Sequence, residues 1–143
     1  HELEYEGAEG IRVGDAVQYV ADAVLPVMPA LPKVASAALH PTCSSTRMGW
    51  NDSLQRCAEA VADEVVVADA WGCCGFAGDR GMLHPELTES ATRHEATELA
   101  EREFDLYLSA NRTCELGMER ATGKPWRHVL SVLAERMVEY APA

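Results

Sequence analysis

The segment EVVVADAWGCCGFAGDRG, residues 64–81, decides the fold class of this chain. Three consecutive valines favour an extended and buried conformation, so we predict a strand over residues 64–71. A glycine-rich loop follows, and a long polar helix is expected over residues 85–104, with proline in its first turn and glutamates near its positive end. The segment therefore indicates a strand–loop–helix unit of an α/β protein.

Further units of this kind lie on both sides of that segment. VASAAL, residues 34–39, is an apolar run of strand length, and a loop rich in Ser, Thr and Gly leads from it into an amphipathic helix over residues 52–64. DLYLSANR, residues 105–112, alternates apolar side chains on one face and is followed by a short helix over residues 113–123 and a helical stripe over residues 126–140. Because strands alternate with helices, we predict a parallel, doubly wound α/β sheet flanked by helices.

The segment before the first strand has a different character. Residues 13–28 have apolar side chains at helical spacing up to Pro26, and further prolines keep the following connector extended. We therefore expect an N-terminal helix and connector over residues 1–33 and a cysteine-rich α/β domain over residues 34–143.

Composition limits the classes of function. The chain has 143 residues, enough for one compact domain, and a formal net charge of −11, which disfavours nucleic acid and anionic lipid as general partners. No apolar run is long enough for a transmembrane helix, and the opening HELEYEGAEG is no secretory signal. Because the chain begins with His1 rather than Met, we expect a fragment of a longer protein. An odd number of cysteines without a signal peptide indicates a reducing compartment, so we expect a location in the cytoplasm or at the inner face of the cell membrane.

The five cysteines are the main candidates for chemistry. Cys43 follows the first predicted strand, Cys73 and Cys74 follow the second, and Cys114 follows the third. The carboxyl ends of parallel strands meet at one edge of a sheet, so three loops would bring four thiols together there. Cys57 lies within the amphipathic helix, where we expect it to act as a small buried hydrophobic residue.

Four thiolates at one site suit an iron–sulfur cluster or a zinc ion. The chain has no C-x-x-C knuckle of the kind that structural zinc sites use, which favours the cluster, and the loop glycines could donate backbone hydrogen bonds to its sulfurs. A disulfide between the adjacent residues Cys73 and Cys74 would be strained. A structural zinc domain, a thiol–disulfide enzyme that uses these two residues, and an interaction module with incidental cysteines stay open as alternatives.

Several weaker signals lie near the same loops. His40 and His84 could be ligands or proton carriers, although a hydrogen bond that orders the loop is the simpler interpretation. Arginines follow the three strands and could offset the charge of a thiolate cluster, attract a carboxylate substrate or pair with neighbouring acids; they are Arg47, Arg80 and Arg112. The glycines of GFAGDRG do not have the spacing of a dinucleotide-binding loop. We interpret the glutamates of the long helix, from Glu86 through Glu95 to Glu103, as a solvated face.

Three segments, HPTCSSTRMG, WGCCGFAGDRGMLHPEL and SANRTCELGM, resemble the CCG-type cysteine-rich domain that binds iron–sulfur clusters. This family includes the cysteine-rich subunit of heterodisulfide reductase and the iron–sulfur subunits of glycolate oxidase and glycerol-3-phosphate dehydrogenase. The likeness is strongest to the C-terminal region of fused FAD-linked D-lactate dehydrogenases, and it runs from about residue 34 to the C-terminus.

The resemblance implies an electron-transfer module of a flavin-dependent 2-hydroxy-acid dehydrogenase. An upstream FAD domain would oxidise D-lactate or a glycolate-like acid, and a 4Fe-4S cluster would pass electrons to a cytochrome or quinone. By position, the ligands implied are Cys43, Cys73, Cys74 and Cys114. The sequence departs from the family pattern in two ways: Gly117 stands where a last cysteine often occurs, and one copy of the domain is present where a second copy is common. The FAD domain and a second cysteine-rich copy are therefore the partners that the resemblance implies.

Overall fold

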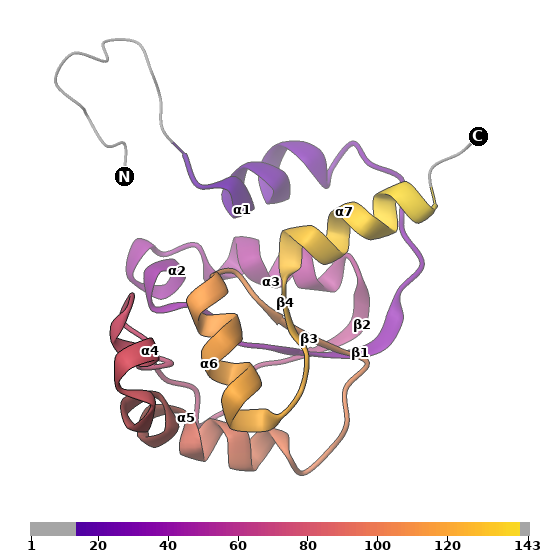
Figure 1. Ribbon diagram of the computed structural model, residues 1–143. Coiled ribbons are helices and arrows are strands. Elements are labelled where there is room, and N and C mark those ends of the chain that lie inside the picture. Colours follow the sequence, from indigo (N-terminus) through magenta and orange to yellow (C-terminus); the bar gives the residue numbers. More distant parts are fainter. Residues whose placement is uncertain (1–13, 141–143) are drawn as a thin grey trace, which may run out of the picture.

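The computed structural model describes residues 14–140, which fold around a four-stranded sheet (Figure 1). The spatial order of the strands is β2-β1-β3-β4, and every neighbouring pair is parallel. The four strands are β1 (Val34–Leu39), β2 (Ala62–Val66), β3 (Leu106–Ser109) and β4 (Trp126–His128). The predicted α/β class with a parallel sheet flanked by helices is confirmed.

Helices cover both faces of the sheet. On one face lie α1 (Ala16–Tyr19), its π-helical continuation η1 (Val20–Val24), α3 (Asn51–Glu59) and α7 (Val129–Glu139) (Figure 1). On the other lie α5 (Pro85–Leu99) and α6 (Arg112–Thr122), while the short helices α2 (Cys43–Met48) and α4 (Arg80–Leu83) lie beyond one end of the sheet. This is the arrangement that a doubly wound sheet requires.

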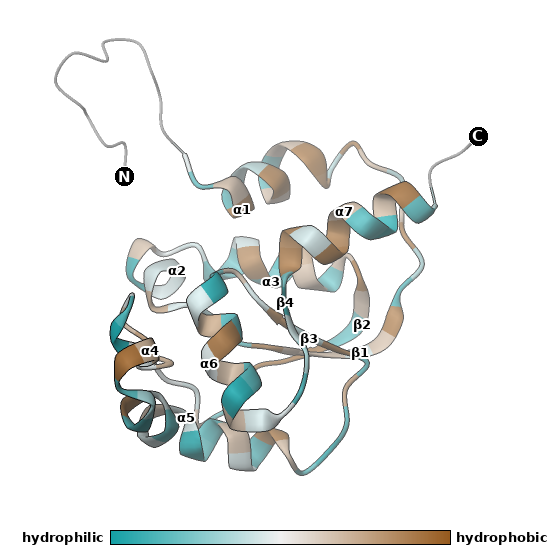
Figure 2. Ribbon diagram, in the orientation of Figure 1, coloured by the Kyte–Doolittle hydropathy of each residue, from teal (hydrophilic) through white to brown (hydrophobic). Residues whose placement is uncertain are grey.

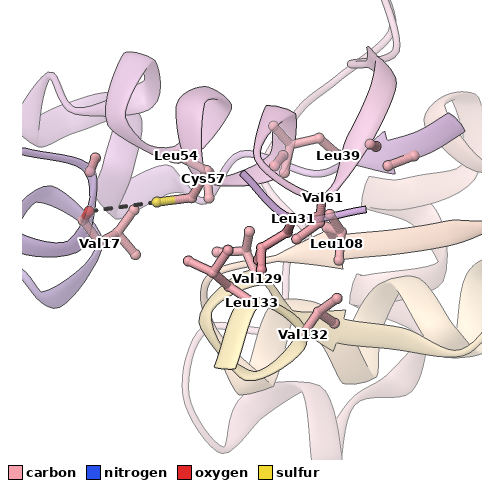
Figure 3. Close-up of a cluster of buried hydrophobic side chains, with 14 of the residues drawn as sticks. Val17, Leu31, Leu39, Leu54, Cys57, Val61, Leu108, Val129, Val132 and Leu133 are labelled. Atoms are coloured by element: carbon pink, nitrogen blue, oxygen red, sulfur yellow. Dashed lines mark hydrogen bonds between the residues drawn. The ribbon is translucent and has the colours of Figure 1, made fainter. Parts of the chain in front are cut away.

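Each face of the sheet has its own hydrophobic core, between the strands and the helices that cover that face (Figure 2). The larger core joins α1, α3 and α7 to the sheet, and Leu54, Val61 and Leu133 are among its buried members (Figure 3). The second core packs Leu99 of α5 and Met118 of α6 against the opposite face. Burial on both faces explains the apolar run of the central strand β1, whereas the edge strands β2 and β4 contain polar side chains.

The strand order creates a switch point between the two central strands. From β1 the chain goes to β2 on one side, then returns past β1 to β3 and continues to β4 on the other side. The connections that follow the carboxyl ends of β1 and β3 therefore diverge, and the crevice between them is where doubly wound sheets bind ligands. Both strands are followed by a cysteine at this edge.

Two elements differ in kind from the sequence prediction. The loop after β1 contains α2, because the Thr42 side chain accepts a hydrogen bond from the Ser45 amide (3.0 Å) and Gly49 ends the helix with left-handed backbone at φ 76°. The helix predicted over residues 126–140 begins only at Val129, because Trp126–His128 pairs with β3 as a fourth strand. The sheet is therefore one strand wider than predicted.

Other predicted elements exist but have different bounds. The helix predicted over residues 52–64 ends at Glu59, and β2 already begins at Ala62, where it pairs with Val34 of β1. The second and third strands end early, at Val66 and Ser109. The long helix stops at Leu99 rather than residue 104. In the first predicted helix, residue 13 lies outside the described residues, and the helix begins at Ala16. Among residues 14–140, no helix is both long enough and apolar enough to cross a membrane.

Candidate metal centre

Four cysteines lie in the connections at the carboxyl edge of the sheet. Cys43 is the first residue of α2, after β1, and Cys114 lies in the first turn of α6, after β3. Cys73 and Cys74 lie in the loop between β2 and α4. Since β1 is hydrogen-bonded to both β2 and β3, these three connections start side by side.

Helix caps fix two of these cysteines. Cys43 follows the N-cap residue Thr42, and the N-cap residue of α6 is Asn111, whose side chain accepts a hydrogen bond from the Thr113 amide at 3.0 Å. Capping of both helices sets the position of the first helical turn, in which each thiol lies. Cys43 and Cys114 are therefore held by regular structure at each end of the site.

A glycine allows the third connection to approach α5. Gly75 has left-handed backbone with φ 67°, and a Cβ atom there would lie 2.8 Å from Ala91 Cβ and 3.0 Å from the Leu87 carbonyl oxygen. No L side chain fits at this contact without a shift of the helix or the loop. Close packing at Gly75 thus places Cys74 against the interior, where only 3% of the residue is exposed.

Gly117, which stands where the family pattern often has a last cysteine, is also a point of close contact. A Cβ atom at this position would lie 3.1 Å from Thr88 Cγ2 and 3.5 Å from the Cβ atom of Cys74. The glycine lets α6 approach both α5 and the cysteine loop. It brings the first turn of α6, with Cys114, close to Cys74.

The deepest part of the site consists of two thiols and one imidazole. The Sγ atoms of Cys74 and Cys114 are 3.1 Å apart and share a hydrogen bond. One ligating atom each from His40, Cys74 and Cys114 lies within 4.8 Å of the other two, and all three residues are buried. Cys43 and Cys73 are exposed, and their thiols interact with each other at the solvent side. The site therefore has a buried N/S end and an exposed thiol end.

His40 is held at three points. Its backbone amide donates to the Leu108 carbonyl oxygen (2.8 Å), and its own carbonyl oxygen accepts from the Ser109 hydroxyl (2.9 Å). Its ring nitrogen Nδ1 is 2.8 Å from Glu95 Oε1 on α5. The other ring nitrogen, Nε2, is buried without a hydrogen-bond partner. The ring thus has a fixed orientation with one nitrogen facing the thiols.

The electrostatics of the buried end favour a negative charge on Cys74. The hydrogen bond with Cys114, the approach of His40 and the Phe76 backbone amide lower the pKa of Cys74 to about 4, although burial acts in the opposite direction. The same hydrogen bond raises the pKa of Cys114, so the shared proton stays on Cys114. Burial opposes a charge on His40, but the proximity of Cys74 and Glu95 outweighs it and raises the pKa of His40 to about 9.

The exposed end behaves differently. The backbone amide of Gly75 favours the thiolate of Cys73, but partial burial and the neighbouring thiols Cys43 and Cys74 together raise the pKa of Cys73. A group of thiols that oppose each other's ionisation needs a cation to hold them all as thiolates. Soft metals such as iron and zinc meet that need.

Cys57 lies apart from this centre. It is fully buried in the core between α3 and α1, with its Sγ atom 3.8 Å from the Val17 carbonyl oxygen (Figure 3). The prediction that Cys57 is a core residue is confirmed. His84 is exposed and pairs with Glu86 instead of joining the thiols.

Of the three arginines named from the sequence, Arg112 pairs with Glu115 at 3.0 Å, as the salt-bridge interpretation expected for it. Arg47 and Arg80 are exposed.

The interpretation of Glu95 as part of a solvated face is wrong. Glu95 is 2% exposed and lies on the inner face of α5 together with Thr88, Thr92 and Leu99. The spacing of these four positions is that of a helical stripe, which could have identified Glu95 as an inward-facing acid. A buried carboxylate requires a partner, and His40 is that partner.

Comparison with protein families identifies one domain in this chain. The model of the family described as CCG, cysteine-rich domain, matches residues 37–119, which include all four clustered cysteines. No curated protein matches the chain at a significant level.

Proposed function

This chain belongs to the CCG family of cysteine-rich domains, and on that premise we propose that it is the iron–sulfur electron-transfer module of an FAD-dependent 2-hydroxy-acid dehydrogenase. Membership of the family fits a metal-binding or electron-transfer module of a redox enzyme. The observation that carries the proposal is the convergence of three connections on one edge of the sheet, with Cys74 and Cys114 in contact and His40 beside them.

The donor set fits a cluster with soft ligands. Cys43, Cys73, Cys74 and Cys114 would be the thiolate ligands, and the lowered pKa of Cys74 favours its thiolate form. The Gly75 and Phe76 amides donate toward the sulfurs of Cys73 and Cys74, and hydrogen bonds of this kind tune a reduction potential. A bound 4Fe-4S cluster would supply one-electron transfer.

Burial is asymmetric across the proposed ligand set, and this asymmetry supports one side of the site as the docking side for redox partners. Cys74 and Cys114 are covered by the fully buried ring of Phe76, which keeps water from the inner thiols. Cys43 and Cys73 face solvent, so the exposed end is the side on which a redox partner could approach. We infer that the FAD domain, a second cysteine-rich copy, or the cytochrome or quinone acceptor docks there.

In the proposed reaction, the flavin takes up electrons in a pair and releases them singly. The FAD domain would oxidise the hydroxyl group of D-lactate or a similar acid to a carbonyl and would take up two electrons and two protons as reduced flavin. The electrons would then leave one at a time through the cysteine-rich module to the acceptor, while the protons return to solvent.

Single Cys→Ser variants of the full-length protein, reconstituted anaerobically, test this function. Substitution of each of the four clustered cysteines should remove iron and stop electron delivery to the acceptor, whereas rapid reduction of the flavin by substrate should persist. Cys57→Ser is the matched control and should keep both its iron and its turnover, because Cys57 lies in the α1–α3 core. Retention of iron in all four variants would contradict the proposal.

A thiol–disulfide function is the second candidate, and one observation favours it. Cys74 has a lowered pKa and lies 3.1 Å from the sulfur of Cys114, so the reactive pair would be Cys74 and Cys114 rather than the adjacent cysteines. Under this alternative, purified reduced protein binds no iron and exchanges with a small disulfide through Cys74. Stoichiometric iron and sulfide would exclude it.

A further inference from the structure

The buried end of the site contains a nitrogen whose role the four cysteines do not explain. His40 is fully buried, and its Nε2 atom has no hydrogen-bond partner. Buried polar atoms are almost always satisfied, and an orphaned one calls for an explanation such as a role as an ion ligand. Nε2 faces Cys74 and Cys114, the two sulfurs that are shielded from solvent.

We propose that His40 is a metal ligand through Nε2, so that the site has a nitrogen donor as well as thiolates, and that Glu95 is the positioning residue that makes this nitrogen available. The separations of the donor atoms fit this role. For bonds of about 2.0 Å to nitrogen and 2.3 Å to sulfur, two donors on one tetrahedral ion are roughly 3.5 Å apart. The Cys74 and Cys114 sulfurs are 3.1 Å apart, and no two of the three donor atoms are more than 4.8 Å apart. These separations bracket the value expected for donors on one ion.

Glu95 sets the orientation of the ring and the position of its proton. Its Oε1 atom lies 2.8 Å from Nδ1, so the carboxylate accepts the Nδ1–H proton. Nε2 is then the nitrogen that gives up its proton when a metal binds and directs its lone pair at the ion. Histidines that bind metals usually donate their second ring N–H to such an acceptor. Glu95 comes from α5, whereas His40 follows β1, so the pair joins two elements that are far apart in the sequence.

A purely structural role for His40 explains less. The hydrogen bonds of its backbone and of Nδ1 would order the loop, but they would do so equally well with a side chain that lacks Nε2. One ring nitrogen is fixed by a buried acid, and the ring lies beside two buried thiols, which is the pattern of a metal ligand.

Anaerobic titration of the reduced, metal-free chain with Co²⁺ alone tests this inference. Glu95→Gln should weaken Co²⁺ binding by about 10–100-fold, as loss of an outer hydrogen-bond partner does at other metal sites, and His40→Gln should weaken it at least as much. The ligand-field bands of any Co²⁺ that remains should shift in His40→Gln. Glu89→Gln on the same helix and His84→Gln are matched controls, since both residues are exposed, and should bind as the wild type does.

A second measurement needs no variant. Proton NMR of the wild-type Co²⁺ form, labelled with ¹⁵N-histidine, should contain one strongly shifted ring N–H signal that exchanges slowly with solvent, because Nδ1–H is buried against Glu95. Absence of that signal, wild-type Co²⁺ affinity in folded His40→Gln, or failure of the wild type to bind Co²⁺ would each overturn the inference.

The inference rests on the proposed function only in that a metal occupies the site, and parallel reconstitution of the wild type with iron and sulfide separates the two. Iron uptake together with Co²⁺ binding that is independent of His40 overturns the nitrogen ligand and leaves the cluster. Co²⁺ binding that depends on His40, without uptake of iron and sulfide, overturns the cluster and supports the nitrogen ligand.

Discussion

The close contact at Gly75 can be tested with a pair of glycine substitutions. Gly75 and Gly78 both have left-handed backbone, at φ 67° and φ 73°, but only Gly75 packs against α5. Alanine in this region of backbone space costs about 1–2 kcal/mol, and the smaller entropy of its unfolded state offsets about 0.4–1 kcal/mol. Gly78→Ala should therefore lower the free energy of unfolding by about 1 kcal/mol.

Gly75→Ala adds a steric cost to that strain. Its Cβ atom would be 2.8 Å from Ala91 Cβ and 3.0 Å from the Leu87 carbonyl oxygen, which belong to a helix that cannot move as a side chain can. Overpacking of this kind costs about 1–3 kcal/mol, so the total loss should be about 2–4 kcal/mol. The loop that carries Cys73 and Cys74 should also shift outward and weaken metal binding.

Urea unfolding of the two metal-free variants measures the difference directly, and Co²⁺ titration of the same samples measures the effect on the site. We expect Gly75→Ala to be less stable than Gly78→Ala by about 1–3 kcal/mol, and only Gly75→Ala to lose metal affinity. Equal stability of the two variants, or wild-type metal affinity in Gly75→Ala, would refute the claim that close packing on α5 positions the cysteine loop.

The remaining predictions concern the core and its independence from metal. Removal of metal with a chelator should leave the circular dichroism nearly unchanged, because the two cores that flank the sheet do not include the exposed thiols; loss of the fold would support a structural zinc site. Cys57→Ser should lower the free energy of unfolding by about 1–3 kcal/mol with metal content retained. Burial raises the pKa of Cys57 from 9.0 to about 11, so the folded protein holds this proton to a higher pH than the unfolded chain does. Stability in urea titrations should therefore decrease as pH rises from 9 to 11, and the decrease should be smaller in Cys57→Ser than in the wild type.

The convergence of the cysteines could be predicted because it follows from topology. Once residues 34–39, 64–71 and 105–112 are taken as parallel strands, the loops after them must meet at one edge, whatever the exact strand ends are. The first strand has the predicted bounds and the other two proved shorter, yet all four cysteines lie beyond the carboxyl ends of their strands: Cys43, Cys73, Cys74 and Cys114. Errors of a few residues at strand boundaries therefore did not affect the site.

The elements that sequence reasoning missed are stabilised by contacts distant in the chain. Trp126–His128 is only three residues long and contains two polar side chains, and it forms a strand because β3 offers a free edge beside it. Local sequence contains no information on that edge. The helix α2 was missed for another reason, since Ser, Thr and Gly favour loops but also form the cap and end of a short helix.

The burial of Glu95 could not be predicted from the composition of its helix. Glu95 lies in a helix with many glutamates, and only its position on the same stripe as Thr92 and Leu99 distinguishes it from its exposed neighbours. Its partner His40 is 55 positions away in the sequence, so the pair can be identified only from the fold, which packs α5 against the end of β1. The candidate thiol ligands could be named from the sequence, whereas the histidine–carboxylate pair beside them required the structure.

Metal and sulfide analysis of anaerobically reconstituted wild-type chain, with Cys114→Ser beside it, tests the central claim most directly. We predict a brown wild-type protein with iron and acid-labile sulfide in equal amounts, and a Cys114→Ser variant that is folded but largely without iron, because Cys114 lies in contact with Cys74 at the buried end of the site. A colourless wild-type protein that binds zinc in preference to iron, and binds no sulfide, would contradict this prediction.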